Sequence, residues 1–127
     1  MITMGKFVIK KSKDEQFYFN LLAGNGQVIC KSEMYKALAS AKNGIESVRK
    51  NVDSKIEDQT VEGYEKVKYP KWEVYVDKAG EYRFRLCASN GENIAASEGY
   101  VRKDSALNGI DSIRRNAPEA EVVEDLE

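Results

Sequence analysis

The sequence contains no histidine, and its 127 residues include only two cysteines and two prolines. The missing histidine removes the commonest general base and metal ligand, and with it any Ser-His or Cys-His nucleophile arrangement. Cys30 and Cys87 alone are too few for a zinc site of the usual kind. Neither a Gly-x-Gly-x-x-Gly motif nor a P-loop occurs. These absences predict a protein that is not an enzyme and holds no cofactor.

Long apolar segments are missing as well. The longest apolar runs cover only a few residues, far short of a membrane span, and no apolar stretch with a cleavage site follows Met1. A hydrophobic content of 42% and a charged content of 32% are typical of a soluble globular protein. The two cysteines occupy non-equivalent positions of the repeat described below. We therefore expect free thiols, a cytoplasmic location and no membrane contact.

Charge is nearly balanced but unevenly distributed along the chain. The net charge is −1, yet residues 1–53 carry nine basic and five acidic side chains, whereas residues 119–127 carry five acidic and no basic ones. A surplus of four positive charges is too small to indicate nucleic-acid binding by itself.

What the sequence does contain is an internal repeat. Residues 6–53 align with residues 71–118 at a constant offset of 65, with 19 identities in 48 positions and no gap. The identities cluster, with LLAGNGQVICKSEMY over LCASNGENIAASEGY and SAKNGIESVRKN over SALNGIDSIRRN. A unit of about fifty residues buries too little surface to be stable alone. We therefore expect two copies that share one core.

Each copy begins with a pattern of period two. Residues 7–10 and 72–76 are rich in β-forming side chains and predict a first strand. The second strand alternates, so that Phe17, Phe19 and Leu21 are expected on one face, as are their equivalents in the second copy.

A hairpin turn is expected after the second strand. Asn25-Gly26 and Asn90-Gly91 predict a type I′ turn, which needs a positive φ at both central residues. A third strand follows, so the first three elements of each copy predict an antiparallel meander.

The period then changes to 3.6, which predicts a helix in each copy. Ala41, Gly44, Ile45 and Val48 form the apolar stripe of the first helix. Glycine within a helix costs about 1 kcal/mol relative to alanine, so a glycine on both apolar stripes predicts a helix backbone that lies close to the sheet.

The helix ends also carry signals. Asp104 and Ser105 predict a cap at the start of the second helix, and Asn51 and Asn116 predict left-handed caps at the two C-termini. The last turn of each helix contains basic residues, which are stabilised there by the negative end of the helix dipole. These signals predict the organisation of the chain. A first repeat covers residues 1–57 and ends with a strand near 55–57, and a linker covers residues 58–70. A second repeat covers residues 71–123, with its last strand near 120–123, and an acidic tail covers residues 124–127.

The repeated residues resemble the signature of the YegP-like family of small bacterial and archaeal proteins. In the first copy the signature comprises Phe19, Leu21, Ala23, Asn25, Gly26, Ile29, Ser32, Glu33, Tyr35, Ala41, Gly44, Ile45, Ser47 and Val48. In the second copy it comprises Phe84, Leu86, Ala88, Asn90, Gly91, Ile94, Ser97, Glu98, Tyr100, Ala106, Gly109, Ile110 and Ser112, with Ile113 in place of the valine. The resemblance implies tandem β3-α-β units joined into one continuous half-barrel sheet. It implies no activity.

The most polar repeated feature is Ser-Glu-x-Tyr, at residues 32–35 and 97–100. One interpretation makes Glu33 and Glu98 paired acid-base groups or a symmetric ligand clamp. The other is structural: the serine turns the chain, the glutamate accepts backbone N–H bonds and the tyrosine packs at the rim of the core. We favour the structural interpretation, because a feature needed to form the unit appears in both copies for that reason alone.

The strand face that points away from the core is the candidate binding face. Aromatic and basic side chains alternate there, an arrangement that stacks bases and contacts phosphates in single-strand binders. The alternative is an ordinary solvated face on which Glu73 or Asp77 pairs with an arginine of the neighbouring strand. The candidate residues are Lys10, Tyr18, Asn20, Tyr75, Arg83 and Arg85.

The sequence thus predicts an α+β pseudo-dimer. Two tandem β3-α-β copies form one continuous antiparallel half-barrel sheet with both helices on one face, and Trp72 takes the place of Phe7 in the core. The chain is expected to be a monomer with internal two-fold pseudosymmetry. We expect a non-catalytic binding module that uses the open sheet face for a protein or single-stranded nucleic-acid partner. The alternative is a small enzyme that uses Glu33, Tyr35, Glu98 and Tyr100.

Overall fold

The computed structural model describes residues 5–126, which fold into eight strands, two long helices and one 3-10 helix. The elements in chain order are β1 (Lys6–Lys11), β2 (Phe17–Leu22), β3 (Val28–Lys31), α1 (Leu38–Asn51), β4 (Ile56–Asp58), β5 (Lys71–Val76), β6 (Tyr82–Cys87), β7 (Asn93–Ala96), α2 (Lys103–Asn116), the 3-10 helix η1 (Ala117–Glu119) and β8 (Glu121–Asp125).

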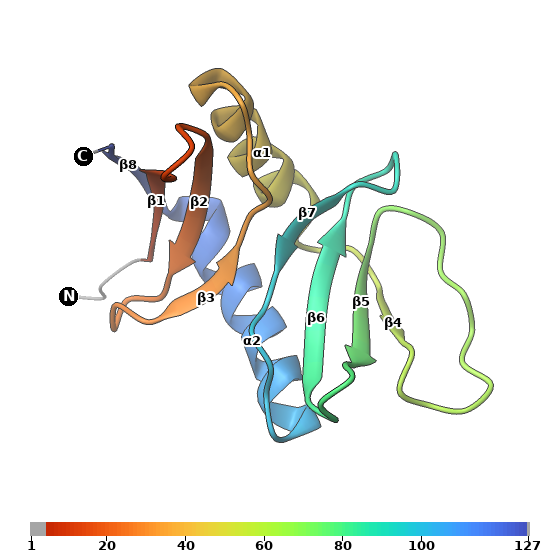
Figure 1. Cartoon of the computed structure of the whole chain (residues 1–127). Helices are drawn as coiled ribbons and strands as arrows, with labels where there is room; N and C mark the ends of the chain where they lie inside the picture. Colours follow the sequence, from red (N-terminus) through yellow and green to blue (C-terminus); the bar gives the residue numbers. More distant parts are fainter. Residues whose placement is uncertain (1–4, 127) are drawn as a thin grey trace.

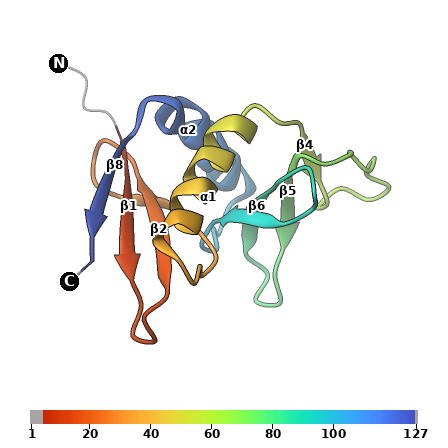
Figure 2. The same cartoon turned by 90° about the horizontal axis from the view of Figure 1, so that it is seen from above.

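All eight strands belong to one sheet, in the order β4-β5-β6-β7-β3-β2-β1-β8. Strands β1, β2 and β3 form the predicted antiparallel meander, as do β5, β6 and β7. The two meanders join where β3 and β7 pair, with Lys31 opposite Ala96. Figure 1 shows both helices behind the sheet, and the view from above in Figure 2 places them between the strands of the two copies. Within residues 5–126 the opposite face of the sheet carries no helix.

The sheet is mixed, so the prediction of a purely antiparallel sheet is wrong. The fourth strand of each copy pairs in parallel with the first strand of the other copy: β4 with β5, and β8 with β1. The reason lies in the helices, because α1 contacts β7 as well as β2, and α2 contacts β3 as well as β6. Each helix therefore crosses the junction and delivers its last strand to the far half. The parallel partner of each last strand therefore belongs to the other copy and is not the strand from which its own helix starts.

The last strand also departs from the constant offset of 65. Trp72 lies opposite Ile56, and its equivalent Phe7 lies opposite Val122, although the offset would place Glu121 there. The second copy therefore has one additional residue before its last strand, in the segment that contains η1. The shift keeps an apolar residue next to Phe7.

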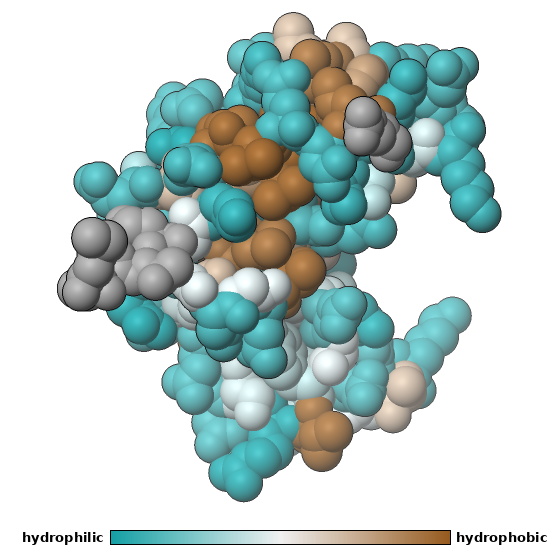
Figure 3. Space-filling model, turned by 90° about the vertical axis from the view of Figure 1, so that its left-hand side faces the viewer, coloured by the Kyte–Doolittle hydropathy of each residue, from teal (hydrophilic) through white to brown (hydrophobic). Residues whose placement is uncertain are grey.

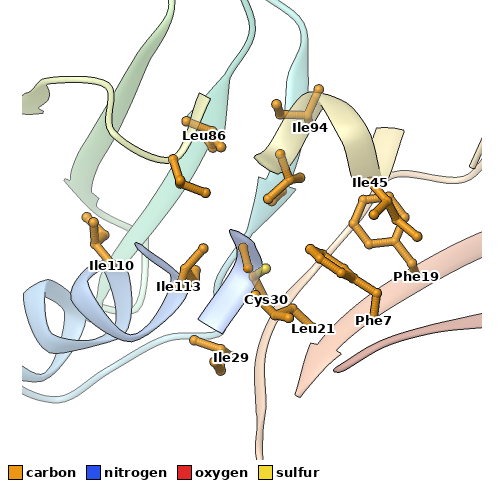
Figure 4. Close-up of a cluster of buried hydrophobic side chains, with 14 of the residues drawn as sticks. Phe7, Phe19, Leu21, Ile29, Cys30, Ile45, Leu86, Ile94, Ile110 and Ile113 are labelled. Carbon is orange, nitrogen blue, oxygen red and sulfur yellow. The ribbon is translucent and has the colours of Figure 1, made fainter. Parts of the chain in front are cut away.

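One apolar cluster fills the space between the sheet and both helices (Figure 4). Trp72 is fully buried in the place predicted from Phe7. The Phe7 ring meets Phe19 edge to face at 5.7 Å, and the Trp72 ring meets Phe84 in the same way at 5.6 Å. The indole N–H of Trp72 donates a hydrogen bond to the Val52 carbonyl at 2.9 Å. The second core ring thus ties the end of the first helix to the second copy.

The helix glycines confirm the predicted close approach. A Cβ atom at Gly44 would lie 3.0 Å from the Phe19 ring, and one at Gly109 would lie 2.8 Å from the Phe84 ring and 3.1 Å from the hydroxyl of Tyr100. Aromatic side chains of the sheet therefore occupy the space that an alanine would need.

The hairpin turns are not type I′. Gly26 and Gly91 have positive φ values of 86° and 85°, and the asparagine before each does not. The Gly26 N–H donates to the Ala23 carbonyl at 2.9 Å, and the Ala23 N–H donates to the Gln27 carbonyl at 2.8 Å. This is a type I turn closed by a glycine bulge, because the loop has one residue more than a two-residue turn.

The helix caps also differ from the prediction. Asn51 and Asn116 are the last helical residues, and their side-chain amides donate back to the Ser47 and Ser112 carbonyls at 2.8 and 2.7 Å. Left-handed caps are therefore absent at these two C-termini in the described chain. The residue before α2, Arg102, is extended and makes no side-chain cap, and the predicted capping residues Asp104 and Ser105 lie within the helix.

Arginines from the opposite copy bind the chain after each helix instead. Arg114 donates to the carbonyls of Val52 and Ser54 at 2.9 and 2.7 Å, just after α1. Arg49 donates to the Pro118 and Ala120 carbonyls at 3.2 and 2.7 Å, just after α2. Each arginine is thus a crosslink between the copies.

Candidate functional site

The six predicted face residues lie on strands β1, β2, β5 and β6 and alternate with core residues such as Ile9 and Val74. Cross-strand pairing places Lys10 opposite Tyr18, and Tyr75 opposite Arg83. Because successive side chains of a strand point to opposite faces, these residues face away from the helices.

The basic members of the set are paired with carboxylates. The Lys10 ammonium lies 3.2 Å from Asp125, and the Nε atoms of Arg83 and Arg85 lie 2.5 Å from Asp77 and Glu73. The arginine pairs were the alternative interpretation of this face. These ion pairs neutralise the three cations, so the face is not a free basic surface.

Two tyrosines of the set carry cations on their rings. The Lys31 ammonium lies 4.7 Å from the centre of the Tyr18 ring, and the Arg85 guanidinium lies 4.4 Å from the centre of the Tyr75 ring. Cation–π attraction of this kind contributes about 0.5–1 kcal/mol at exposed sites. Each ring therefore has one face engaged by the protein itself.

The two copies enclose a hollow of about 430 Å³ on the open face, where β3 meets β7. Tyr18, Asn20 and Arg83 of the predicted set line this hollow, whereas Lys10, Tyr75 and Arg85 lie outside the hollow. The structure thus brings half of the predicted residues together. Lys31, which also lines the hollow, was not predicted, although its position next to Ser-Glu-x-Tyr was a signal.

In each Ser-Glu-x-Tyr element the serine and the tyrosine have structural roles, and the glutamate does not. The Ser32 hydroxyl accepts the Phe19 N–H at 2.9 Å and donates to the Glu33 carbonyl at 2.8 Å. Ser97 makes the equivalent bonds to Phe84 and Glu98 at 2.9 and 2.8 Å. The serines therefore link the second strand of each copy to the chain after the third, a structural role other than the predicted turn of the chain.

The tyrosines of the motif are also structural. Tyr35 and Tyr100 stack on the buried rings of Phe19 and Phe84, each with 6.3 Å between ring centres. Burial raises the pKa of both tyrosine hydroxyls, and nearby negative charges, including Glu33 for Tyr35, raise the pKa further. A raised pKa keeps these hydroxyls protonated and makes them poor general bases.

The glutamates of the motif have no comparable structural role. Glu33 and Glu98 both line the central hollow. Within the described chain, neither carboxylate forms a side-chain hydrogen bond or an ion pair, so the prediction that they accept backbone N–H bonds is wrong. They are exposed at the rim because the serine, and not the glutamate, holds the chain at this point.

A second cluster of charged groups was missed by the sequence interpretation. The Lys71 ammonium lies 2.7 Å from Glu57 and 3.2 Å from Glu73, and Glu73 in turn binds Arg85. Glu57, Lys71 and Glu73 are 2%, 6% and 6% exposed. The signal was present, because charged residues alternate with Trp72 and Val74 in one strand.

Glu57 is held as a carboxylate despite its burial. Burial acts to raise its pKa, but hydrogen bonds from Lys71, Gln59 and the Val67 N–H, together with the charge of Lys71, hold the pKa at about 2. The Val67 bond, at 2.7 Å, and the Tyr69 ring, which lies 4.7 Å from the Lys71 ammonium, come from the predicted linker. The chain after β4 is therefore an ordered strap over the charged cluster, and residue 58, the first of the predicted linker, still belongs to β4.

The strap and β4 leave a further hollow of about 590 Å³, and a third of about 390 Å³ lies between α1 and β8. Figure 3 shows the side of the molecule formed by β1 and β8, where apolar side chains are exposed among hydrophilic ones. Glu124, predicted to belong to an acidic tail, lies in β8 and forms an ion pair with Lys42 at 2.9 Å. Asp125 also belongs to this strand, and Glu127 lies outside the described residues.

The cysteines offer no reactive centre. Both are free and buried, and burial raises the pKa of Cys30 to about 12 and also raises that of Cys87. A thiol with a raised pKa is a weak nucleophile and metal ligand. In residues 5–126 no group of three or more Cys, Asp or Glu side chains is arranged to hold a metal ion. Neither described helix has the length and apolarity needed to cross a bilayer.

The repeat organisation has a counterpart in known families. The family model for a domain of unknown function, DUF1508, matches residues 12–58 and again residues 77–124. The chain belongs to this family. The two matches correspond to the two copies, and the YegP resemblance is confirmed at the same time.

Relatives of similar length share this organisation. The chain is 41% identical to UPF0339 protein PA0329 of Pseudomonas aeruginosa, over 91% of this chain and 92% of that protein. It is 41% identical to UPF0339 protein YegP of Yersinia pestis, over 98% of both chains. The solution structure of Escherichia coli YegP, a protein of unknown function, superposes with a TM-score of 0.80 at 33% identity and covers 99% of this chain and 97% of its own.

Another relative carries one copy. UPF0339 protein Atu5359 of Agrobacterium fabrum is 59% identical over 54 residues, which are 42% of this chain and 87% of that protein. One repeat can thus form nearly an entire chain, although in the present fold each copy needs a strand from the other.

Proposed function

We propose that the chain is a non-catalytic binding module, and that the central hollow on the open sheet face is its binding site. The observation that carries this proposal is the position of Glu33 and Glu98. Both line one hollow of about 430 Å³ together with Tyr18, Asn20 and Arg83. Ligand pockets are typically of 300–1,000 Å³ and combine apolar surface with a few convergent polar groups.

The proposal includes the state of the molecule. The chain acts as a cytoplasmic monomer, because each copy receives its partner's strand from within the same chain and the two thiols are free. The sheet curves as a half-barrel, which makes its open face concave. The open face, with Lys10, Tyr75 and Arg85 at its flanks, extends the contact surface for a larger partner such as a protein.

Single-stranded nucleic acid is the second candidate for the same face. The stacked pairs of Lys31 with Tyr18 and of Arg85 with Tyr75 support it, since bases stack on exposed aromatic rings. The ion pairs to Asp77, Glu73 and Asp125 oppose it, because a phosphate would have to compete with a carboxylate for each of these cations. A small enzyme built on the repeated Glu and Tyr groups is the third candidate, and the raised pKa values of the tyrosines oppose it.

The test is an amide-shift titration of the isotope-labelled chain with a bacterial metabolite extract. We expect shifts at the amides of Tyr18, Lys31 and Ala96 that disappear in the double variant Glu33→Gln, Glu98→Gln. Shifts confined to the strap, or unchanged in the double variant, would refute the hollow as the site. A short oligothymidine in low salt tests the alternative, which requires shifts at Tyr75 and Arg85 because electrostatic binding is strongest under that condition.

A further inference from the structure

The two copies of the repeat meet at two equivalent places, where each last strand lies beside the first strand of the other copy. We call these places the β4–β5 junction and the β8–β1 junction. Glu57 lies opposite Glu73 at the β4–β5 junction, and the equivalent residue Val123 lies opposite Val8 at the β8–β1 junction. The β4–β5 junction is therefore charged, whereas the β8–β1 junction is apolar at the same positions.

The charged junction combines groups from both copies. The first copy contributes Glu57, whose carboxylate lies 2.7 Å from the ammonium group of Lys71 in the second copy. The second copy also contributes Glu73, which pairs with Lys71 and with Arg85. Glu57, Lys71 and Glu73 are all buried. Because a buried charge that loses its partner is strongly destabilising, the second copy favours a last strand that carries a carboxylate at this position.

The apolar junction lacks the groups that Glu57 needs. Val8 stands there in place of Glu73, and Lys6, the equivalent of Lys71, is exposed. If β4 lay beside β1, the Glu57 carboxylate would face Val8, and an ion pair with an exposed lysine would contribute little. If β8 lay beside β5, its valine would face Glu73. Pairing of like copies thus mismatches both junctions.

The indole of Trp72 adds a second preference at the charged junction. Its N–H donates to the Val52 carbonyl, which follows α1 of the first copy, at 2.9 Å. Phe7 occupies the equivalent position of the first copy, next to β8. In a pair of two first copies the Val52 carbonyl would face the Phe7 ring, which has no N–H to donate. The indole bond is therefore lost when two first copies pair.

We infer that the interface between the copies selects unlike copies, and that Glu57 with Lys71 and Glu73 determines the choice. The partner that fits the second copy is a repeat with a carboxylate at the Glu57 position of its last strand. The partner that fits the first copy is a repeat with an apolar residue at the Val123 position. Specific interfaces use such mismatches against the wrong partner. The chain is thus a specific heterodimer of repeats joined in one polypeptide, and this inference does not depend on the central hollow.

The test cuts the folded chain and measures which copies pair again. A protease recognition site replaces residues 61–66, which are exposed in the strap. The chain is folded, cut at this site, unfolded in urea and refolded with both pieces present, and native mass spectrometry then counts the pairs. Random pairing gives unlike pairs twice as often as each like pair. We expect unlike pairs to exceed each like pair by at least about twentyfold, which is roughly tenfold beyond random pairing.

The first variant removes the difference between the junctions. Glu57→Val, Glu73→Val and Arg85→Asn give the β4–β5 junction the residue types of the β8–β1 junction. The ratio of unlike to like pairs should then fall toward the random value. The control, Arg102→Gln with Asp104→Asn, removes an exposed ion pair outside both junctions and should leave the ratio unchanged.

The second variant makes both junctions charged. It carries Val8→Glu, Asn20→Arg and Val123→Glu, and the ratio should again fall toward the random value. Because the two variants change the charge in opposite directions, one of them still decides the question if the other does not refold. Random pairing of the unmodified pieces, or a preference for unlike pairs that survives in the variants, would overturn the inference. Pieces that never pair again would overturn it as well, because the interface would then depend on the intact strap.

Discussion

The buried charged cluster beneath the strap predicts a specific loss of stability in acid. In the folded chain the pKa of Glu57 is about 2, against an ordinary value of 4.5. Because folding lowers this pKa, the stabilisation is fully present above about pH 4.5 and is lost as the pH falls toward about 2. One pKa unit corresponds to about 1.4 kcal/mol, so the ionised form of Glu57 contributes on the order of 3 kcal/mol at neutral pH.

The perturbation is Glu57→Gln, which keeps the shape of the side chain and removes its charge. Lys71 still has Glu73 at 3.2 Å, so no buried ammonium is left without a counter-charge. We expect urea unfolding at pH 7 to show a loss of about 3 kcal/mol relative to the unmodified chain, in line with the ionisation contribution above. At pH 2.5 the difference should shrink to about 1 kcal/mol, because the pH is then close to the folded-state pKa of Glu57, about 2, and the unfolded chain already binds the proton.

The control is Glu65→Gln, which removes an exposed carboxylate from the same strap. Exposed substitutions of this kind usually stay within about 0.5 kcal/mol at either pH. The reasoning is refuted if Glu57→Gln and the unmodified chain lose stability in parallel from pH 7 to pH 2.5. That result would mean that Glu57 is not the group that carries the charge of the cluster.

Three further substitutions test the packing and the backbone. Gly109→Ala should destabilise the chain by about 1–2 kcal/mol in thermal or urea unfolding, because overpacking outweighs the gain in helix propensity of about 1 kcal/mol. Asn108→Ala, on the exposed side of the same helix, should not destabilise it. Arg114→Lys should cost about 1–2 kcal/mol, since lysine cannot reach both carbonyls as the guanidinium does, and the exposed Arg115→Lys should change less than 0.5 kcal/mol. Glu15→Gly should stabilise the chain by about 1 kcal/mol, because this residue has a positive φ of 62°, and unchanged stability would contradict that expectation.

The sequence was sufficient to predict the strands and helices of each copy, but not the type of its turns or its helix caps. The periods of two and 3.6 predicted the meanders and helices, and the glycines on the helix stripes predicted that each helix backbone lies close to the sheet, which the nearby rings of Phe19 and Phe84 confirm. These features depend on residues close together in the chain. The exchange of the fourth strands could not be predicted in this way, because the pairing of β4 with β5 depends on where α1 packs across the junction.

The candidate site shows the same limit. Alternation identified residues of the open face, including Tyr18 and Arg83, since a strand has only two faces. It could not identify which of them converge, because the hollow forms where β3 meets β7 and these strands are 65 residues apart. It offered the pairing of Arg85 with Glu73 only as an alternative, because that pairing depends on the register of β5 against β6 and not on composition.

Comparison of the two copies separates residues that the fold requires from residues that it does not explain. Residues that the copies share, such as Ser32 and Ser97, have structural hydrogen bonds that would be needed in any chain with this fold. Glu33 and Glu98 are shared as well, but they have no bond of that kind in the described chain, so the fold does not explain them. Lys31 lies on one side of the β3–β7 junction, and the equivalent position on the other side is Ala96. Duplication accounts for the equivalence of the two glutamates, whereas the divergence at Lys31 makes the two ends of the hollow chemically different.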